Sequence, residues 1–207
     1  MFKPSPWGDH RRMRIGLLGG SFNPAHDGHL HISIEARRLL ALDQVWWLVS
    51  PQNPLKSNRD MAPLAQRVAQ AQEIASAPWL QTVTLEQDFG TVRTWETLRV
   101  LKTRFPKAEF VWLMGADNLE QIPRWARWSK IFKSVHVAVF DRSPYSHRVL
   151  YGKASRRFAS HRLKASHGRA LWAKSAQRWV YFAQRRHTAS STKIRLSGKM
   201  SSVARSD

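Results

Sequence analysis

Short apolar runs alternate with longer helical segments along most of this chain, and this alternation constrains its fold most strongly. Strands are expected at 14–18, 45–49, 82–85, 109–114, 134–140 and 179–183. Helices are expected from about residue 27 and at 61–77, 91–104 and 124–132. Because strands and crossover helices alternate, the sequence predicts an α/β protein with a Rossmann-like, doubly wound parallel sheet.

The length of 207 residues favours a single domain, which we place at residues 13–196. Residues 1–12 lack apolar periodicity and are expected to form a disordered lead-in, while residues 197–207 form a polar tail. The basic segment 143–178 lies within the domain and is expected to contain one helix and some loop. The sequence contains no internal repeat and does not indicate an oligomeric state.

The composition excludes several classes of protein. The chain has no cysteine, which excludes a disulfide scaffold, a thiolate zinc site and a cysteine nucleophile. No apolar run reaches the roughly 18 residues that a membrane helix needs, and the N-terminus lacks the apolar region of a secretory signal. These features predict a cytoplasmic enzyme or binding protein with no membrane partner.

The charge balance indicates an anionic partner. Lysine and arginine total 34 against 14 aspartates and glutamates, a formal net charge of +20, and no acidic residue occurs from Ser143 to Arg195. Such a field attracts polyanions without choosing among them. An enzyme acting on phosphate compounds and a nucleic-acid-binding protein are therefore both open. No known nucleic-acid-binding module is visible, and a solvated basic face explains the stretch more simply, so nucleic acid is not an expected partner.

The first expected strand runs into a glycine- and histidine-rich segment that precedes the first expected helix. Its sequence is Gly19-Gly20-Ser21-Phe22-Asn23-Pro24-Ala25-His26-Asp27-Gly28-His29. The glycines permit close approach of the backbone to a ligand, and the helix N-terminus favours an anion. The two histidines add side-chain donors. Two alternatives are a glycine-rich turn that occurs by chance and the turn of a dinucleotide-binding fold. The glycine spacing differs from the GxGxxG pattern of dinucleotide-binding folds.

This segment resembles the signature of the HxGH nucleotidyltransferase superfamily. A second signature of that superfamily is a Ser/Thr-rich turn that opens a late helix. The matching segment here is Ser190-Ser191-Thr192-Lys193-Ile194-Arg195, which is similar to SSTxIR. Hydroxyls and amides at a helix start, followed by arginine, suit a polyphosphate. The resemblance implies that these two distant segments meet at one site.

Three further segments are similar to those of the bacterial nicotinate-nucleotide adenylyltransferase family. They are Pro51-Gln52-Asn53-Pro54-Leu55-Lys56, Thr94-Trp95-Glu96-Thr97-Leu98, and Trp112-Leu113-Met114-Gly115-Ala116-Asp117-Asn118-Leu119 with Trp125 and Trp128. The resemblance covers about residues 14–142 and 180–196. Arg93 and Glu96 depart from the usual tyrosine and aspartate, and Ala189 departs from the usual isoleucine or leucine.

The resemblance implies adenylyl transfer from ATP to nicotinate mononucleotide, which gives deamido-NAD and pyrophosphate. The attacking phosphate is already anionic, so catalysis needs positioning and charge stabilisation rather than a general base. The implied partners are ATP and nicotinate mononucleotide. Mg²⁺ is the implied cofactor because it accompanies ATP, and no residue is assigned as a metal ligand.

The resemblance also implies roles for individual residues. The catalytic residues are His26, His29 and Arg195. The residues that bind ATP or phosphate are Gly19, Gly20, Ser21, Phe22, Gly28, Ser191, Thr192, Gly115 and Asp117. The residues that bind the nicotinate nucleotide are Asn53, Lys56, Thr94 and Trp125.

Plain structural alternatives stay open for several of these residues. Asp117 would serve equally well as a helix cap, Lys56 as a solvated loop lysine, and Trp125 as a packing residue. His31 lies outside the motif and is expected on a helix surface. Sister enzymes that use nicotinamide mononucleotide or pantetheine phosphate as acceptor also remain alternatives for the whole chain.

Overall fold

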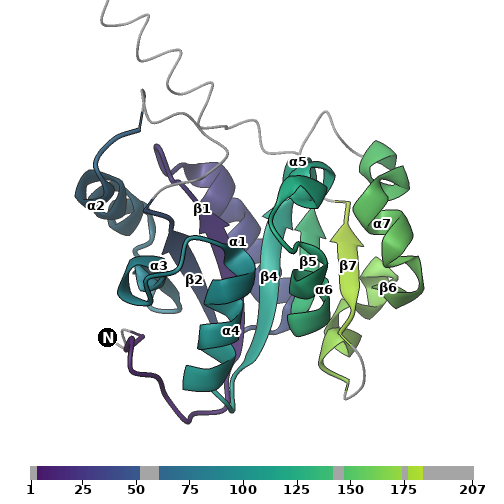
Figure 1. The fold of residues 1–207 in the computed structure, drawn as a ribbon, viewed down its shortest axis with the longest axis horizontal. Coiled ribbons are helices and arrows are strands. Elements are labelled where there is room, and N and C mark those ends of the chain that lie inside the picture. Colours follow the sequence, from purple (N-terminus) through teal and green to yellow (C-terminus); the bar gives the residue numbers. More distant parts are fainter. Residues whose placement is uncertain (1–3, 52–60, 142–146, 174–176, 184–207) are drawn as a thin grey trace, which may run out of the picture.

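A computed structural model describes residues 4–51, 61–141, 147–173 and 177–183, and it contains a seven-stranded sheet in the order β3-β2-β1-β4-β5-β7-β6 (Figure 1). Every adjacent pair of strands is parallel. The strands are β1 (Arg14–Gly20), β2 (Gln44–Val49), β3 (Leu80–Val83), β4 (Glu109–Gly115), β5 (His136–Phe140), β6 (Arg162–Leu163) and β7 (Trp179–Phe182). The predicted doubly wound parallel sheet is confirmed, with the order reversing between β1 and β4.

Helices cover both faces of the sheet, as the alternation predicts. The α-helices are α1 (Asp27–Leu40), α2 (Leu64–Ile74), α3 (Leu85–Asp88), α4 (Thr94–Arg104), α5 (Ala116–Gln121), α6 (Ser129–Ser134) and α7 (Lys153–Arg157). The 3-10 helices are η1 (Ile122–Arg124), η2 (His147–Tyr151), η3 (Ala159–His161) and η4 (Ala165–Trp172). In Figure 1, α4, α5 and α6 lie in front of the sheet and α1 lies behind it.

Alternate residues of each central strand enter two different cores. In β1, Ile15 and Leu17 face the core beneath α4, α5 and α6, whereas Leu18 faces the core beneath α1 and α2. In β2, Trp46 and Trp47 divide in the same way. A parallel strand that is buried on both faces needs a continuous apolar run, which is the pattern that the sequence shows.

Several boundaries differ from the sequence prediction. The strand predicted at 82–85 lies two residues earlier, at Leu80–Val83, and Leu85 already begins α3. The predicted helix at 124–132 begins only at Ser129: the chain leaves η1 after Arg124, and Arg127 takes a left-handed φ of 50° that breaks a helix. The short helices α3 and α5 were not predicted.

The basic segment contains more regular structure than one helix and loop. Its described part, residues 147–173, includes η2, α7, η3, β6 and η4. The two residues of β6 pair with Trp179 and Val180 at the edge of the sheet. The Ser/Thr-rich turn at Ser190–Arg195, which is expected to open a late helix, lies outside the described residues.

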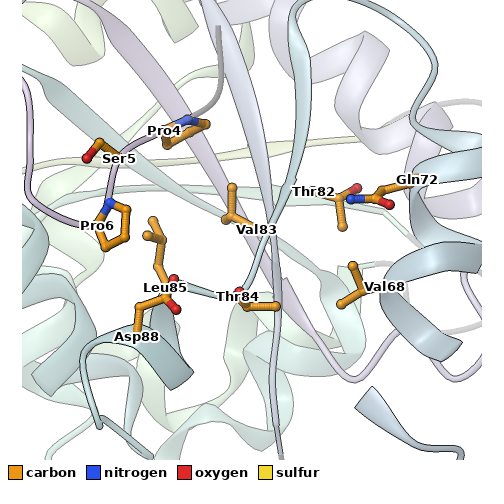
Figure 2. A pocket seen from close by; sticks show the side chains of 10 residues that line it. All are labelled: Pro4, Ser5, Pro6, Val68, Gln72, Thr82, Val83, Thr84, Leu85 and Asp88. Atoms are coloured by element: carbon orange, nitrogen blue, oxygen red, sulfur yellow. The ribbon is translucent and has the colours of Figure 1, made fainter. Parts of the chain in front are cut away.

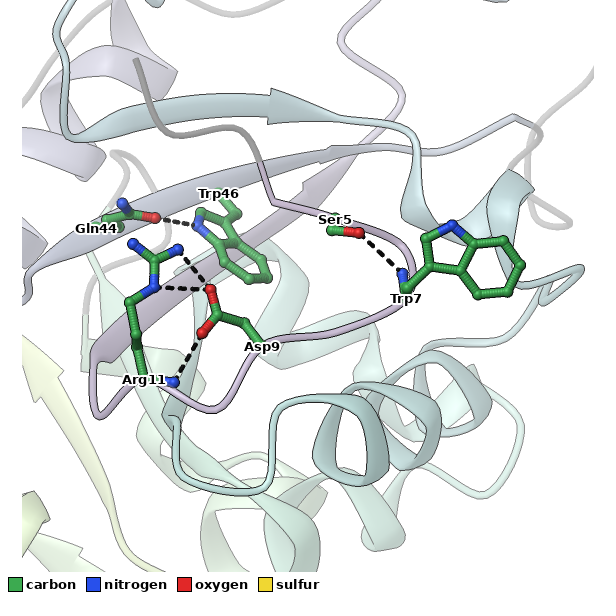
Figure 3. Close-up of polar contacts among 6 residues, drawn as sticks. All are labelled: Ser5, Trp7, Asp9, Arg11, Gln44 and Trp46. Carbon is green, nitrogen blue, oxygen red and sulfur yellow. Dashed lines mark hydrogen bonds and ion pairs between the residues drawn. The ribbon is translucent and has the colours of Figure 1, made fainter.

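Residues 4–12 form no helix or strand, but they contact α4. The Asp9 amide donates to the Arg104 carbonyl at 3.0 Å, and the Arg104 guanidinium donates to the Pro6 carbonyl. Within the segment, Arg11 Nε donates to Asp9 Oδ2 at 2.8 Å (Figure 3). The division into lead-in, domain and tail stays a prediction. No helix in the described ranges combines the length and apolarity that crossing a membrane requires.

Trp172 connects the basic segment to α1 and to the central sheet through a hydrogen bond and ring contacts. Its indole Nε1 donates to the Leu40 carbonyl at the end of α1 at 2.7 Å. The ring also meets His136 edge-on with 5.5 Å between centroids, and the Arg14 guanidinium lies 5.3 Å from its centroid. One buried side chain therefore connects η4, α1 and the sheet.

The substitution Trp172→Phe keeps an aromatic ring and removes the hydrogen bond to Leu40. We expect a loss of about 1 kcal/mol in the free energy of unfolding, which lowers Tm by roughly 2–4 °C for a chain of this size. Thermal denaturation followed by circular dichroism measures the shift. Trp7→Phe is the control, because that side chain is 86% exposed, and equal shifts for both variants would contradict the assignment.

Candidate active site

The end of β1 and the loop after it lie at the carboxyl edge of the sheet, next to the end of β2. The Ser50 amide donates to the Gly20 carbonyl at 2.9 Å, which extends the β1–β2 pairing by one residue. Gly19 cannot carry a side chain, because a Cβ there would lie 2.4 Å from the Trp112 ring of β4. Gly19 is predicted to let a ligand approach the backbone closely. The structure adds a second role, because the absence of a side chain lets the Trp112 ring pack against Gly19.

His26 and His29 cap the N-terminus of α1 through reciprocal hydrogen bonds. His26 Nδ1 accepts from the Gly28 amide at 3.0 Å, and His29 Nδ1 accepts from the His26 amide at 3.2 Å. The two ring centroids are 3.9 Å apart. Because each Nδ1 acts as an acceptor, the proton of each neutral ring belongs on Nε2. Both predicted catalytic histidines therefore carry a donor N–H on the side opposite the cap.

A cluster of aromatic side chains fixes the orientation of His29. The Phe22 ring lies 4.7 Å from the His29 ring and stacks on Trp47 at 5.1 Å. Ser33 Oγ donates to the His29 carbonyl and accepts from Trp47 Nε1, each at 2.8 Å. Phe22 is buried and has a left-handed φ of 46°. Phe22 is predicted to bind ATP. In the structure its buried ring packs against the rings of His29 and Trp47.

Arg67 of α2 joins the loops that follow β1 and β2. Its Nη1 donates to the carbonyls of Ser21 at 2.6 Å and Ser50 at 2.7 Å. Its Nη2 donates to the Pro51 carbonyl and its Nε to the Ala62 carbonyl, both at 2.9 Å. Only 1% of this side chain is exposed, and burial lowers the pKa of its guanidinium. Backbone carbonyls satisfy its donors, so it braces this edge of the site.

Arg67 was not singled out from the sequence, although its position in the sequence indicates a buried arginine. Arg67 lies in the stripe of α2 that includes Leu64, Val68 and Ala71, at the spacing of one helix face. An arginine within an otherwise apolar stripe indicates a buried guanidinium with specific acceptors.

Glu86 of α3 is a second buried charged residue that the sequence did not reveal. It accepts a hydrogen bond from the Ser50 side chain, and burial raises the pKa of its carboxyl group. It stands in a short helix with no motif around it. Ser50 therefore contacts both residues, through its carbonyl to Arg67 and through its side chain to Glu86.

The end of β4 forms the second half of the site. Gly115 is the N-cap residue of α5, and Asp117 lies in the first turn of that helix, which has no side-chain cap. The helix-cap alternative for Asp117 is therefore wrong. Its Oδ1 atom is buried and has no hydrogen-bond partner among the described residues. A buried acceptor of this kind is costly unless a ligand or water satisfies it.

Trp125 and Thr94 lie on the face of the sheet that also carries α5. The Trp125 ring meets Trp112 edge-on, with 6.4 Å between centroids, and is half-buried. Thr94 begins α4, whose N-terminus has no side-chain cap. Trp112 therefore contacts both Gly19 and Trp125, so one indole adjoins the glycine loop and the predicted pyridine platform.

Some predicted site residues cannot be placed. Asn53, Lys56, Ser191, Thr192 and Arg195 lie outside the described residues, so their meeting with the histidines stays a prediction. His31, expected on a helix surface, is half-buried on α1.

A cavity of about 460 Å³ lies beside the edge strand β3, and neither histidine lines it (Figure 2). It is lined by the N-terminal segment, α2 and the β3–α3 connection, with no predicted site residue in its wall. The predicted site residues that the structure describes therefore lie outside the wall of this cavity.

Comparisons with known proteins agree with this geometry. The family described as Cytidylyltransferase-like matches residues 17–197. A curated protein of Cereibacter sphaeroides, named a probable nicotinate-nucleotide adenylyltransferase, is 46% identical over 187 residues, which cover 90% of this chain and 98% of that protein. A protein of the same name from Bradyrhizobium sp. is 45% identical over 183 residues, covering 88% and 95%.

Solved structures support the fold. The nicotinic acid mononucleotide adenylyltransferase of Plasmodium falciparum, in complex with APC, has a TM-score of 0.65 and covers 89% of this chain and 83% of that chain at 14% identity. The same protein in complex with NaAD has a TM-score of 0.63. At the identities and coverage of its curated relatives, the chain belongs to the nicotinate-nucleotide adenylyltransferase family of cytidylyltransferase-like proteins.

Proposed function

We propose that this protein transfers the adenylyl group of ATP to nicotinate mononucleotide, giving deamido-NAD and pyrophosphate in NAD biosynthesis. The curated relatives, which match over most of the chain, carry this activity in their names. The observation that supports the chemistry most directly is the pair His26 and His29, whose Nδ1 atoms cap α1 and whose protons therefore lie on Nε2. The predicted cytoplasmic location is part of this proposal.

The proposed reaction is a direct displacement at the α-phosphorus of ATP. A phosphate oxygen of the mononucleotide forms a bond to the α-phosphorus. The bond between the α-phosphorus and the oxygen that bridges it to the β-phosphate breaks. The electron pair of the broken bond leaves with pyrophosphate. Because the attacking phosphate oxygen is already anionic, no proton must be removed from the nucleophile. We infer that the histidine Nε2–H groups and the α1 N-terminus stabilise the charge on the phosphate oxygens.

The remaining roles follow the family resemblance. Arg195, Ser191 and Thr192 are proposed to hold the departing pyrophosphate. We propose that Mg²⁺ enters with ATP, because ATP arrives as its magnesium complex and shielded phosphates react more readily. The phosphates would then supply its ligands.

The acceptor is proposed to bind between β4 and α4. Trp125 would stack on the pyridine ring, with Thr94 at the uncapped start of α4 beside it. Asn53 and Lys56 are proposed to contact the same nucleotide. Asp117 is proposed to accept from a ribose hydroxyl, which would satisfy its buried Oδ1 atom.

A panel of acceptors tests the proposed function. With ATP and Mg²⁺, we expect the purified protein to adenylate nicotinate mononucleotide with a higher kcat/KM than nicotinamide mononucleotide or pantetheine phosphate. Release of pyrophosphate measures each rate. Equal or reversed preferences would contradict the proposed substrate, and no transfer to any acceptor would contradict the reaction.

The substitution His29→Ala tests the histidine pair. We expect kcat to fall by roughly 10²–10³, the usual effect of losing one donor to a transition state. Circular dichroism confirms that the variant is folded, since the side chain also accepts from the His26 amide. His161→Ala is the matched control, because His161 is exposed in η3. A rate equal to that of the control would remove His29 from the mechanism.

The substitution Arg67→Met tests the brace beneath the site. Several buried carbonyls lose their donor, so we expect the free energy of unfolding to fall by about 3 kcal/mol. Urea denaturation measures this change. The exposed Arg38, which pairs with Glu35 on α1, supplies the control Arg38→Met, for which we expect less than about 0.5 kcal/mol. Similar losses in the two variants would show that Arg67 is not a brace.

A further inference from the structure

Three cationic side chains gather around the indole of Trp95, in the first turn of α4. The Arg127 guanidinium lies 4.7 Å from the ring centroid, the Lys130 ammonium 4.9 Å and the Arg99 guanidinium 5.9 Å. Arg127 and Lys130 come from the segment that leads from Trp125 into α6, whereas Arg99 lies one turn further along α4. We call Arg99, Arg127 and Lys130 on Trp95 the cation cluster; its three cations lie outside the motifs described above, whereas Trp95 belongs to the segment Thr94–Leu98.

The cluster connects the two elements that the proposed function assigns to the pyridine ring. Trp95 directly follows Thr94, and Arg127 lies two residues after Trp125. The segment between them is held by turns: the Trp128 amide donates to the Trp125 carbonyl at 3.2 Å, and the Lys130 amide to the Arg127 carbonyl at 2.8 Å. Arg127 has a left-handed φ of 50°, which makes a sharp bend after the platform.

No carboxylate in the described part of the chain forms an ion pair with these three cations. The nearest acidic residue in the same helix turn, Glu96, pairs instead with Arg93 at 3.6 Å. Arg127 and Lys130 both lie within 5 Å of one ring centroid, so their charged groups are within about 10 Å of each other. Like charges at this distance repel, and a nearby anion relieves that repulsion.

Two further features make the surroundings of Trp95 suited to a negative group. The N-terminus of α4 has no side-chain cap, so its amides and helix dipole favour negative charge. The Trp95 Nε1 atom is buried and lacks a hydrogen-bond partner among the described residues. The uncapped helix start and the indole Nε1 therefore add two kinds of donor to the three cations around Trp95.

We infer that Arg127 and Lys130 are specificity-determining residues that favour an acceptor with a carboxylate on its pyridine ring over one with a neutral amide. The inference rests on the proposed function, because it concerns the same acceptor site. The two side chains act by placing uncompensated positive charge beside that site, with Trp95 holding both in position. Their effect on the acceptor is electrostatic and requires no direct contact with the carboxylate.

A purely structural role for the cluster is the alternative, since the cations on Trp95 also fasten α6 to α4. Loss of such a contact would change KM or kcat for acid and amide acceptors alike. An electrostatic role changes the ratio between the acceptors and weakens as salt screens the charges.

The test is the double variant Arg127→Met/Lys130→Met, which keeps side-chain length and removes two charges. We measure KM and kcat for nicotinate and nicotinamide mononucleotide at saturating ATP, at low and physiological ionic strength. We expect KM for the nicotinate acceptor to rise about 3- to 10-fold, while KM for the amide and both kcat values change by less than about 2-fold. The salt dependence of KM for the acid should diminish. Arg127→Lys/Lys130→Arg should retain the wild-type ratio.

The control variant Lys107→Met/Lys164→Met removes two exposed charges elsewhere. Lys107 precedes β4, at the edge of the sheet opposite the site, and Lys164 lies beside β6. If the acid-to-amide ratio of KM is unchanged in the Arg127/Lys130 variant, or changes equally in the control, the inference is wrong while the proposed function stands. If the wild-type protein adenylates neither acceptor, the proposed function fails and the inference fails with it.

Discussion

The hydrogen bonds by which the His26 and His29 side chains cap α1 are the interaction on which the site depends. A helix that starts at the carboxyl edge of a parallel sheet presents unpaired amides to any ligand bound there. Here the two imidazoles satisfy two amides through Nδ1, at 3.0 and 3.2 Å. The same bonds fix the rings and leave each proton on Nε2. The same two hydrogen bonds therefore cap α1 and orient two N–H donors toward an anion.

Neighbouring strands hold that arrangement in place. Trp112 of β4 packs on Gly19 and meets Trp125, so the positions of the glycine loop and of the pyridine platform depend on one buried side chain. On the other side, Arg67 binds the carbonyls that follow β1 and β2. The edge of the sheet is therefore braced from both faces, by an indole on one and by a guanidinium on the other.

The parts of the structure that sequence reasoning found are those with a local pattern. Long apolar runs and helical periodicity located the central strands and α1, α2 and α4, and the HxGH segment lies at the predicted turn. Short elements such as α3, α5 and β6 lack enough residues to show a period. The bend at Arg127 depends on a backbone conformation that its residue type does not indicate.

Contacts between distant residues were not visible in the sequence. The sequence does not show that Trp112 excludes a side chain at Gly19, or that Arg67 reaches Ser21. No sequence pattern around Glu86 indicates that its side chain is buried. The histidines were predicted as ligand contacts, but their capping role was not, because histidine is not among the usual cap residues.

Nitrogen-15 NMR of the imidazole rings tests the arrangement of His26 and His29 most directly. We expect both neutral rings to carry the proton on Nε2, with Nδ1 showing the shift of a hydrogen-bond acceptor. Addition of ATP with Mg²⁺ should then move the Nε2 signals and leave the Nδ1 signals nearly unchanged. Protonation on Nδ1 in either ring, or Nε2 signals that do not respond to ATP, would contradict the proposed role of the histidine pair.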